Sequence, residues 1–350
     1  MQIAGTATAF PAQYYSQATL AAALQERWAP QFPHPEVIER MLTRVGVEGR
    51  YLALPMERYY KLNAFGVTND AWIEVACELG EKALYCALMR AGVDPGELDA
   101  IYFVSVTGIA SPSIDARLVN RMKLPARIKR VPIFGLGCVA GAAGIARAAD
   151  YLRGFPKQTA ALVSVELCSL TWQREDTSLA NIISTGLFGD GAAAAVLTGS
   201  EREATQGPKI LATRSSFYSD TEDVMGWSVS EKGFQIVLSP AVPDVVHKHL
   251  AQDVDAFLGE QGLTRSDIGS WIMHTGGPKI LSATTEALGL PADALEASWA
   301  CLKKVGNLSS ASVLLVLDEF MYRRRPEPGS YSILAAMGPG FCAELVLLRW

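Results

Sequence analysis

Three polar residues stand where the 350-residue chain passes from one predicted element to the next, and their types suit acyl transfer. Cys138 follows the strand-like run 131–134 and precedes a helix whose first turns are almost entirely Gly, Ala and Val. The unpaired amides and the dipole at such a helix start favour a thiolate, which is a nucleophile. The alternative is a small buried cysteine used for close helix packing, because free cysteines usually lie in cores.

His274 and Asn307 occupy comparable places. His274 ends the apolar run 271–273 and precedes a Thr-Gly-Gly-Pro turn, so its imidazole could pair with a thiolate and donate to a developing oxyanion. Taken alone, a histidine that caps its strand is the better explanation. Asn307 follows Gly306 and precedes a Ser-rich helix start, where it is either an N-cap residue or an amide donor aimed at a carbonyl oxygen. The catalytic interpretation becomes stronger because all three residues lie near glycine at strand ends or helix starts.

Alternating strands and helices position these residues. Near-continuous apolar runs at 101–106, 160–165 and 332–336 predict strands of sheets that are covered on both faces. The helices predicted between such strands include 70–89, 113–124 and 243–258. The pattern predicts an α/β protein.

The chain also contains a weak internal repeat. The stretch that begins at Gly92 matches the one that begins at Gly262, an offset of 262 − 92 = 170 residues, and the same offset carries Gly137 onto Asn307. Two similar turns, 189–191 and 338–340, each lead into a strand. We therefore expect two copies of one α/β unit, residues 1–200 and 201–350, with Cys138 and Asn307 as neighbours near the centre.

Composition excludes several classes of protein. With 19% charged residues and a net charge of −5, the chain lacks the basic excess of nucleic-acid-binding proteins. The apolar and small-residue run 134–146 is shorter than the ~18 residues of a membrane span, and the N-terminus lacks the basic region of a signal peptide. The six cysteines are scattered and the four histidines are few, so neither disulfides nor a metal site is indicated. We expect a cytoplasmic protein without a membrane segment.

One motif points to a different function. Gly135, Gly137 and Ala140 satisfy a loose G-x-G-x-x-A dinucleotide-binding pattern, and Glu166 ends the next predicted strand. The match is weak, because it lies in mid-chain and Glu166 is about ten residues later than the ~20-residue spacing expected. Nicotinamide binding would also leave His274 and Asn307 unexplained.

Around these residues the chain resembles the type III polyketide synthases, the chalcone synthase-like branch of the thiolase superfamily. The most specific segments are GLGCVAGA at Cys138, GLFGDGAAA at Phe188, WIMHTGGPKIL at His274, GNLSSASVLLVLDE at Asn307 and MGPGF at 337–341. Ala336 departs from the glycine that many members have before this last turn. The resemblance implies a thiolase-like fold, layered αβαβα, with two mixed sheets around a central buried helix pair.

The resemblance also implies an iterative condensing enzyme. Cys138 would take an acyl group from a starter coenzyme A thioester. His274 would maintain the thiolate, and with Asn307 would hold the malonyl-CoA thioester oxygen during decarboxylation. The extended chain would cyclise to a pyrone, resorcinol or phloroglucinol-type product. No cofactor and no acyl carrier protein would be needed, and the enzyme would be a homodimer, with Ser111 in a loop that reaches the partner.

Further residues take roles from the same match. Phe188 resembles the gate between the coenzyme A tunnel and the cavity, and the turn Gly338, Pro339 and Gly340 matches a substrate-binding loop. Arg40 and Arg44, on a helix that begins near Pro35, match coenzyme A-binding positions but could equally be a solvated helix face. The positions that match cavity-lining residues are Cys168, Thr171, Gly226, Ile236 and Ser309. Several are small, which favours a roomy cavity, a fatty acyl starter and an alkylpyrone or alkylresorcinol product.

Three alternatives stay open at this point. A ketoacyl synthase III-like enzyme shares the fold and the Cys, His and Asn, but performs one condensation on a carrier protein. A Rossmann dehydrogenase would bind a nicotinamide cofactor. A non-catalytic relative would bind acyl-CoA without forming a covalent intermediate.

Overall fold

The computed structural model describes residues 1–29, 36–203 and 206–350, and its longest sheet runs β11-β12-β13-β8-β1-β7-β6-β4-β5. The N-terminal part of this sheet consists of β1 (Gln2–Ala9), β4 (Ala100–Val104), β5 (Lys129–Ile133), β6 (Thr159–Leu167) and β7 (Asp190–Thr198). The C-terminal part consists of β8 (Lys209–Phe217), β11 (Ile268–Met273), β12 (Tyr331–Gly338) and β13 (Cys342–Arg349). The register between β1 and β8 covers a single pair, Gln2 with Lys209, so two mixed sheets meet at their edges.

The two parts repeat one pairing pattern. β4–β6 is parallel while β6–β7 and β7–β1 are antiparallel, and β11–β12 is parallel while β12–β13 and β13–β8 are antiparallel. The turns before β4 and β11 repeat as well, since Gly92 and Gly262 have φ of +66° and +69°. Each is followed by a capping box, Asp94 with Glu97 and Thr264 with Asp267. These local signals explain why one sequence offset linked the two stretches.

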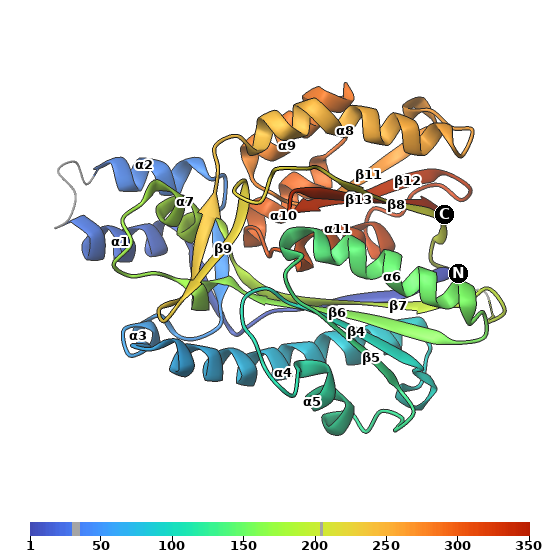
Figure 1. Cartoon of the computed structure of the whole chain (residues 1–350), viewed down its shortest axis with the longest axis horizontal. Helices are drawn as coiled ribbons and strands as arrows, with labels where there is room; N and C mark the ends of the chain where they lie inside the picture. The colour runs from blue at the N-terminus through green and yellow to red at the C-terminus, as the bar shows by residue number, and fades with distance from the viewer. Residues whose placement is uncertain (30–35, 204–205) are drawn as a thin grey trace.

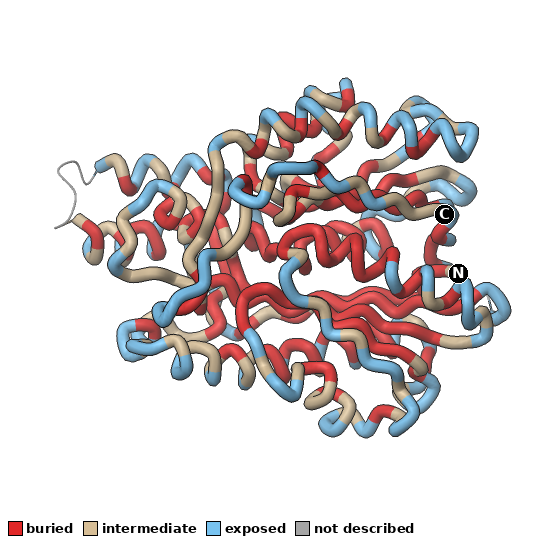
Figure 2. The backbone as a smooth tube through the Cα atoms, viewed as in Figure 1, coloured by how far each residue is buried: buried red, intermediate tan, exposed pale blue. Residues whose placement is uncertain are grey.

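Helices and sheets form five layers (Figure 1). The outer helices on one side are α4 (Phe65–Ala91) and α5 (Ile114–Arg121), and those on the other are α8 (Val242–Gly259) and α9 (Pro278–Leu288). The central layer contains α6 (Ala140–Gly154) and α11 (Ala311–Tyr322), with α10 (Glu296–Val305) leading to α11. Both central helices and the strands against them are buried (Figure 2). This is the αβαβα arrangement of the thiolase fold.

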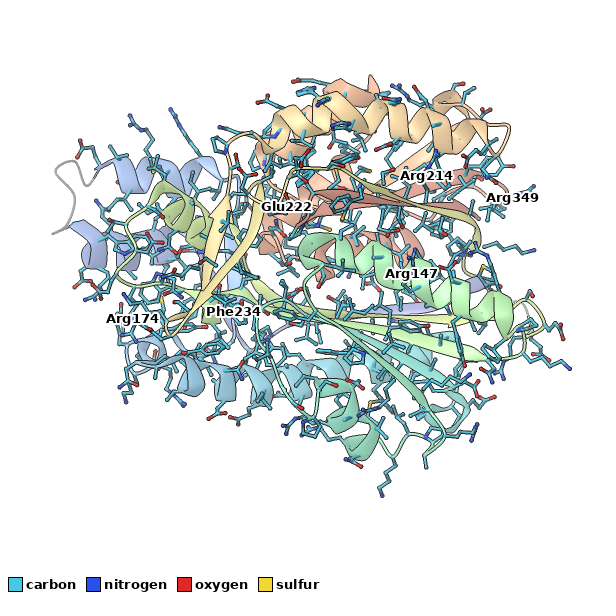
Figure 3. The ribbon with its side chains drawn as sticks, viewed as in Figure 1. Arg147, Arg174, Arg214, Glu222, Phe234 and Arg349 are labelled. Atoms are coloured by element: carbon cyan, nitrogen blue, oxygen red, sulfur yellow. The ribbon has the colours of Figure 1, made fainter. Side chains whose placement is uncertain are left out.

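Small residues let the two central helices meet. A Cβ on Gly141 would lie 2.2 Å from the carbonyl oxygen of Ser310, so the start of α6 touches the start of α11. The first charged residue of α6 is Arg147 at its midpoint (Figure 3), which pairs with Asp150 at 3.3 Å. The small residues after Cys138 therefore allow the start of α11 to pack close to the cysteine.

Short elements cover one end of the sheets, at the left of Figure 1. They comprise β2 (Gln13–Ser16), α1 (Gln17–Trp28), α2 (Glu36–Arg44), β3 (Gly49–Leu52), α3 (Met56–Tyr59), α7 (Leu179–Leu187), β9 (Met225–Ser230) and β10 (Gly233–Leu238). The helix predicted near Pro35 is α2, and Pro35 itself lies outside the described residues. Across the described ranges, no helix combines the length and apolar character needed to cross a bilayer.

Candidate active site

Cys138 lies in a 3₁₀ turn, Gly137–Val139, between β5 and α6. Its side chain is buried, and its Sγ is 3.6 Å from Oγ of Ser309, at the start of α11. Gly137 has φ of +53°, and a Cβ there would come within 2.7 Å of Pro339. A Cβ on Gly338 would come equally close to the backbone nitrogen of Val139. The predicted turn at 338–340 therefore packs directly against the cysteine loop.

Burial dominates the electrostatics of this thiol. Removal from water raises the pKa of Cys138 to about 12, although the hydrogen bond with Ser309 acts in the opposite direction. The helix start is expected to favour the thiolate, and burial acts against that contribution. Desolvation of the charged form outweighs it, and a thiolate needs a base beside the sulfur.

His274 directly follows β11, and its backbone nitrogen donates to the carbonyl of Ala335 in the neighbouring strand at 3.0 Å. The ring is buried, and its Nδ1 has no partner among the described residues. Burial lowers the pKa of His274 to about 4, so the imidazole is neutral at physiological pH. A buried neutral ring with an unpaired nitrogen can accept a proton or donate to a ligand.

Asn307 is fixed by its backbone and by its amide oxygen. Its N–H donates to Leu187 and its carbonyl accepts from Gly189, both at 2.9 Å, so it is paired with the segment that carries Phe188. Its Oδ1 accepts from the backbone nitrogen of Ser309 at 2.8 Å and from Oγ of Ser312 at 3.2 Å. In the described part of the chain no acceptor engages Nδ2. The amide nitrogen is therefore the polar group left for a ligand.

These contacts connect most of the predicted site. Cys138 contacts Ser309, Ser309 contacts Asn307, and Asn307 pairs with the Phe188 segment. His274 joins from the strand end next to the one that carries Gly338. The predicted adjacency of the two helix starts is observed.

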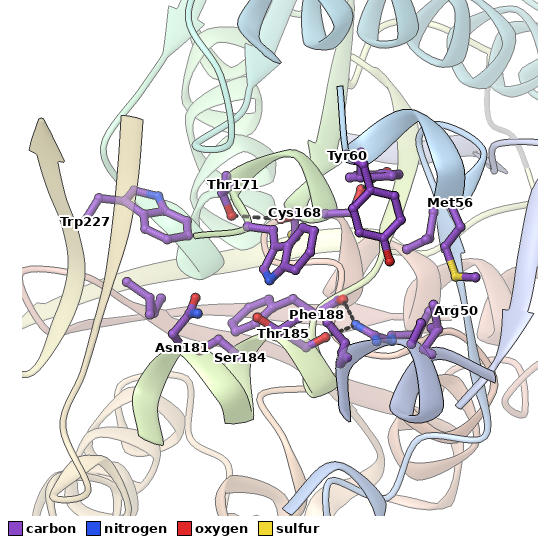
Figure 4. Close-up of a pocket in the computed structure, with 18 residues that line it drawn as sticks. Arg50, Met56, Tyr60, Cys168, Thr171, Asn181, Ser184, Thr185, Phe188 and Trp227 are labelled. Atoms are coloured by element: carbon purple, nitrogen blue, oxygen red, sulfur yellow. Dashed lines mark hydrogen bonds between the residues drawn. The ribbon is translucent and has the colours of Figure 1, made fainter. Parts of the chain in front are cut away.

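A cavity of about 90 Å³ lies beside Phe188 (Figure 4). Four predicted residues line it, namely Cys168, Thr171, Phe188 and Ile236, whereas Gly226 directly precedes the lining residue Trp227. Large side chains fill most of the wall, including Met56, Tyr59, Tyr60, Trp172 and Trp227. This volume is below the ~300–1,000 Å³ of pockets for drug-sized ligands. The lining residues do not include Cys138, His274 or Asn307, so the roomy reaction cavity stays a prediction.

Arg40 and Arg44 lie apart from this cluster. Both are exposed on α2, and neither forms an ion pair with another described residue. This exposed position is compatible with both explanations, contact with coenzyme A and a solvated helix face.

Two buried acids near the cysteines were missed as parts of the site. Glu166 accepts from Thr107 Oγ1 at 2.9 Å, from the backbone of Val106 at 3.1 Å, and from Ser310 Oγ. Burial raises its pKa to about 7. These bonds occupy both of its oxygens inside the core, so Glu166 cannot serve a dinucleotide ribose. The sequence feature that could have identified Glu166 as a buried acid is its place in an otherwise apolar strand.

The second acid belongs to a polar cluster beside the cavity. Asp190 accepts from the backbone nitrogens of Ala53 at 2.5 Å and Ser169 at 2.8 Å, and burial raises its pKa to about 6. Arg50, also buried, lines the cavity and donates to the carbonyls of Thr185 and Phe188 (Figure 4). No sequence pattern marked Arg50, because its partners are backbone atoms more than a hundred residues away.

Comparison with known proteins identifies the family. The family described as "Chalcone and stilbene synthases, C-terminal domain" matches residues 209–350, and "FAE1/Type III polyketide synthase-like protein" matches 24–214. The chain is 49% identical to a 1,3,6,8-tetrahydroxynaphthalene synthase of Streptomyces peucetius subsp. caesius, over 99% of this chain and 93% of the relative. It is 36% identical to a putative chalcone synthase of Bacillus subtilis, over 87% and 86%.

Solved structures agree with the sequence relatives. The crystal structure of 1,3,6,8-tetrahydroxynaphthalene synthase from Streptomyces coelicolor A3(2) superposes with a TM-score of 0.95 at 30% identity, covering 100% of this chain and 99% of that one. A polyketide synthase of the brown alga Ectocarpus siliculosus gives 0.91 at 28% identity, covering 99% and 97%. The predicted resemblance is confirmed: the chain belongs to the type III polyketide synthases, condensing enzymes that form carbon–carbon bonds iteratively from coenzyme A thioesters.

Proposed function

We propose that Cys138, His274 and Asn307 are the catalytic residues of this polyketide synthase. The contact between Cys138 Sγ and Ser309 Oγ, with Ser309 held in turn by Asn307 Oδ1, carries the proposal. It links the nucleophile to the amide donor through one residue. His274, a buried neutral imidazole at the end of β11, would supply the base that the raised pKa of the thiol requires.

The first step loads the starter. The Cys138 thiol gives its proton to the His274 imidazole, and the thiolate attacks the carbonyl carbon of the acyl-CoA. The carbon–sulfur bond to coenzyme A breaks, and the leaving thiolate takes the proton from the imidazolium. The products are acyl-Cys138, free coenzyme A and neutral His274, the state that burial favours.

Extension follows in two steps. As the carboxylate of malonyl-CoA leaves as carbon dioxide, the electron pair of the broken bond moves to the thioester oxygen, which accepts from Asn307 Nδ2 and His274. The enolate carbon then attacks the acyl-Cys138 carbonyl and releases the thiolate. Each cycle adds two carbons. The extended chain returns to Cys138 or cyclises.

We propose a small, polar polyketide product, of the tetrahydroxynaphthalene type. The 49% identity to a 1,3,6,8-tetrahydroxynaphthalene synthase supports it. A naphthalene skeleton has ten carbons, which five two-carbon units supply, so malonyl-CoA alone suffices. This proposal takes the place of the fatty acyl starter that the small lining residues favour, because the identity to a naphthalene-forming relative is the more specific signal.

The other expectations about the site and the assembly remain proposals. Phe188, Cys168, Thr171, Ile236, Gly226 and Ser309, with the turn 338–340, would shape the cavity, while Arg40 and Arg44 would contact coenzyme A phosphates. Residues 1–200 and 201–350 would be the two thiolase-like halves. The enzyme would be a cytoplasmic homodimer that uses neither a cofactor nor an acyl carrier protein.

The test is incubation with malonyl-CoA alone, followed by mass spectrometry of the products. We expect a ten-carbon aromatic product, and no product from Cys138→Ala. A requirement for a long-chain acyl-CoA, with alkylpyrone products, would contradict the proposed substrate. A single extension that depends on a carrier protein would contradict iterative condensation itself.

A further inference from the structure

Arg50 joins the two segments that carry Phe188 and Asn307. It lies in β3 with 3% of its surface exposed, far in sequence from either segment. Its Nη1 donates to the carbonyl of Phe188 at 2.6 Å and also to the carbonyl of Thr185. These are carbonyls at the C-terminus of α7, which lack partners within the helix and attract a cation.

The stem of Arg50 fills the space between the same two segments. A Cβ on Gly306 would lie 3.1 Å from Cδ of Arg50, and a Cβ on Gly189 would lie 3.5 Å from its Cβ. Gly189 directly follows Phe188, and Gly306 directly precedes Asn307. Arg50 therefore touches both sides of the Phe188–Asn307 pairing.

The charge of Arg50 is balanced locally. Asp190 favours the charged guanidinium, while burial lowers the pKa of Arg50 to about 10, so the group is charged at neutral pH. Asp190 also accepts from the backbone of Ala53, three residues after Arg50, which ties the loop after β3 to the start of β7. The guanidinium is therefore held by its two carbonyl acceptors, and the charge of Asp190 acts on it without an ion pair between them among the described residues.

We propose that Arg50 is a positioning residue that holds Phe188 against Asn307 and so couples decarboxylation to condensation. This proposal rests on the proposed function. Asn307 has its own supports in Ser309 and Ser312, so its amide stays in place without Arg50. The Phe188 carbonyl has Arg50 as its only hydrogen-bond donor among the described residues.

The expected defect is therefore loss of coupling. Without the guanidinium, the Phe188 side of the site moves and water reaches the enolate. The enolate then takes a proton, and malonyl-CoA plus one proton yields acetyl-CoA and carbon dioxide without a new carbon–carbon bond. Misplacement by about 1 Å is enough to cost up to ~100-fold in a reaction step.

The experiment measures polyketide product formed per carbon dioxide released from malonyl-CoA. Arg50→Met keeps most of the stem and removes the donors, and Arg50→Lys keeps the charge. Arg265→Met is the matched control, because Arg265 likewise donates to a helix C-terminal carbonyl, that of Leu288 at 2.6 Å, and pairs with an acid, Asp255, away from the cavity.

We expect the ratio to fall about tenfold in Arg50→Met and about threefold in Arg50→Lys, with KM for malonyl-CoA changed less than about threefold. The control should keep the wild-type ratio even if it loses stability. A wild-type ratio in folded Arg50→Met would overturn the role of Arg50. If that variant does not fold, a wild-type ratio in Arg50→Lys overturns it instead. Failure of the wild-type enzyme to release carbon dioxide would refute the proposed function rather than this role.

Discussion

Replacing Asn307 by alanine separates its two functions. The side chain offers Nδ2 to a ligand and uses Oδ1 to accept from Ser309 and Ser312. Loss of one oxyanion donor typically raises a barrier by ~3 kcal/mol, so decarboxylation should slow by about a hundredfold or more. The variant also leaves the buried N–H of Ser309 without an acceptor, which should lower the free energy of unfolding by ~1–3 kcal/mol.

Ser312→Ala is the matched control for that stability loss. Its hydroxyl accepts from the backbone nitrogen of Leu308 at 2.7 Å, so its removal also orphans one buried N–H. Nδ2 of Asn307 stays in place. We therefore expect a similar loss in the free energy of unfolding, but decarboxylation slowed by less than about tenfold.

The assay is the initial rate of carbon dioxide release from saturating labelled malonyl-CoA, alongside urea unfolding of each variant. The two variants should match in stability and differ about tenfold or more in rate. The reasoning is refuted if folded Asn307→Ala decarboxylates within tenfold of wild type. It is also refuted if Ser312→Ala is as slow as Asn307→Ala.

Three further predictions concern protons and packing. His274→Gln should slow iodoacetamide labelling of Cys138 at pH 7 by about a hundredfold, since buried thiols need a base; an unchanged rate would exclude that pairing. Burial raises the pKa of Glu166 from 4.5 to about 7. The protonated carboxyl therefore stabilises the fold fully below pH 4.5, and this stabilisation is lost as the pH rises through 7. Relative to wild type, Glu166→Gln should gain about 3 kcal/mol of unfolding free energy from pH 4.5 to 7; parallel curves would contradict this. Gly338→Ala should cost about 1–3 kcal/mol in urea unfolding, and Gly226→Ala, whose Cβ meets open space, much less; equal losses would contradict the packing argument.

Local patterns in the sequence were sufficient for much of the fold. Gly92 and Gly262 begin the two matched stretches in the left-handed region, and each precedes a capping box, so a short segment contains the whole signal. The small residues after Cys138 likewise predicted close helix contact, which the approach of Gly141 to Ser310 confirms. Such features depend on neighbours in sequence.

The parts that the sequence could not show depend on distant residues. Cys168 and Thr171 are expected to line a cavity, but their neighbours in its wall, Tyr59 and Trp227, come from other parts of the chain. The helix start predicted a favoured thiolate at Cys138. The pKa of this thiol depends mainly on burial, which atoms from distant parts of the chain produce. Arg50 went unnoticed because both of its acceptors are backbone carbonyls. Burial and backbone contacts of this kind arise only from the assembled fold.

The most direct test of the account is to locate the acyl group on the enzyme. Peptide mapping by mass spectrometry after brief incubation with malonyl-CoA should place a thioester-linked adduct on the Cys138 peptide, and Cys138→Ala should carry none. Cys168 is the informative competitor, because it is a second buried thiol and lines the cavity beside Phe188. An adduct on Cys168, or one that persists in Cys138→Ala, would contradict the assignment of the nucleophile.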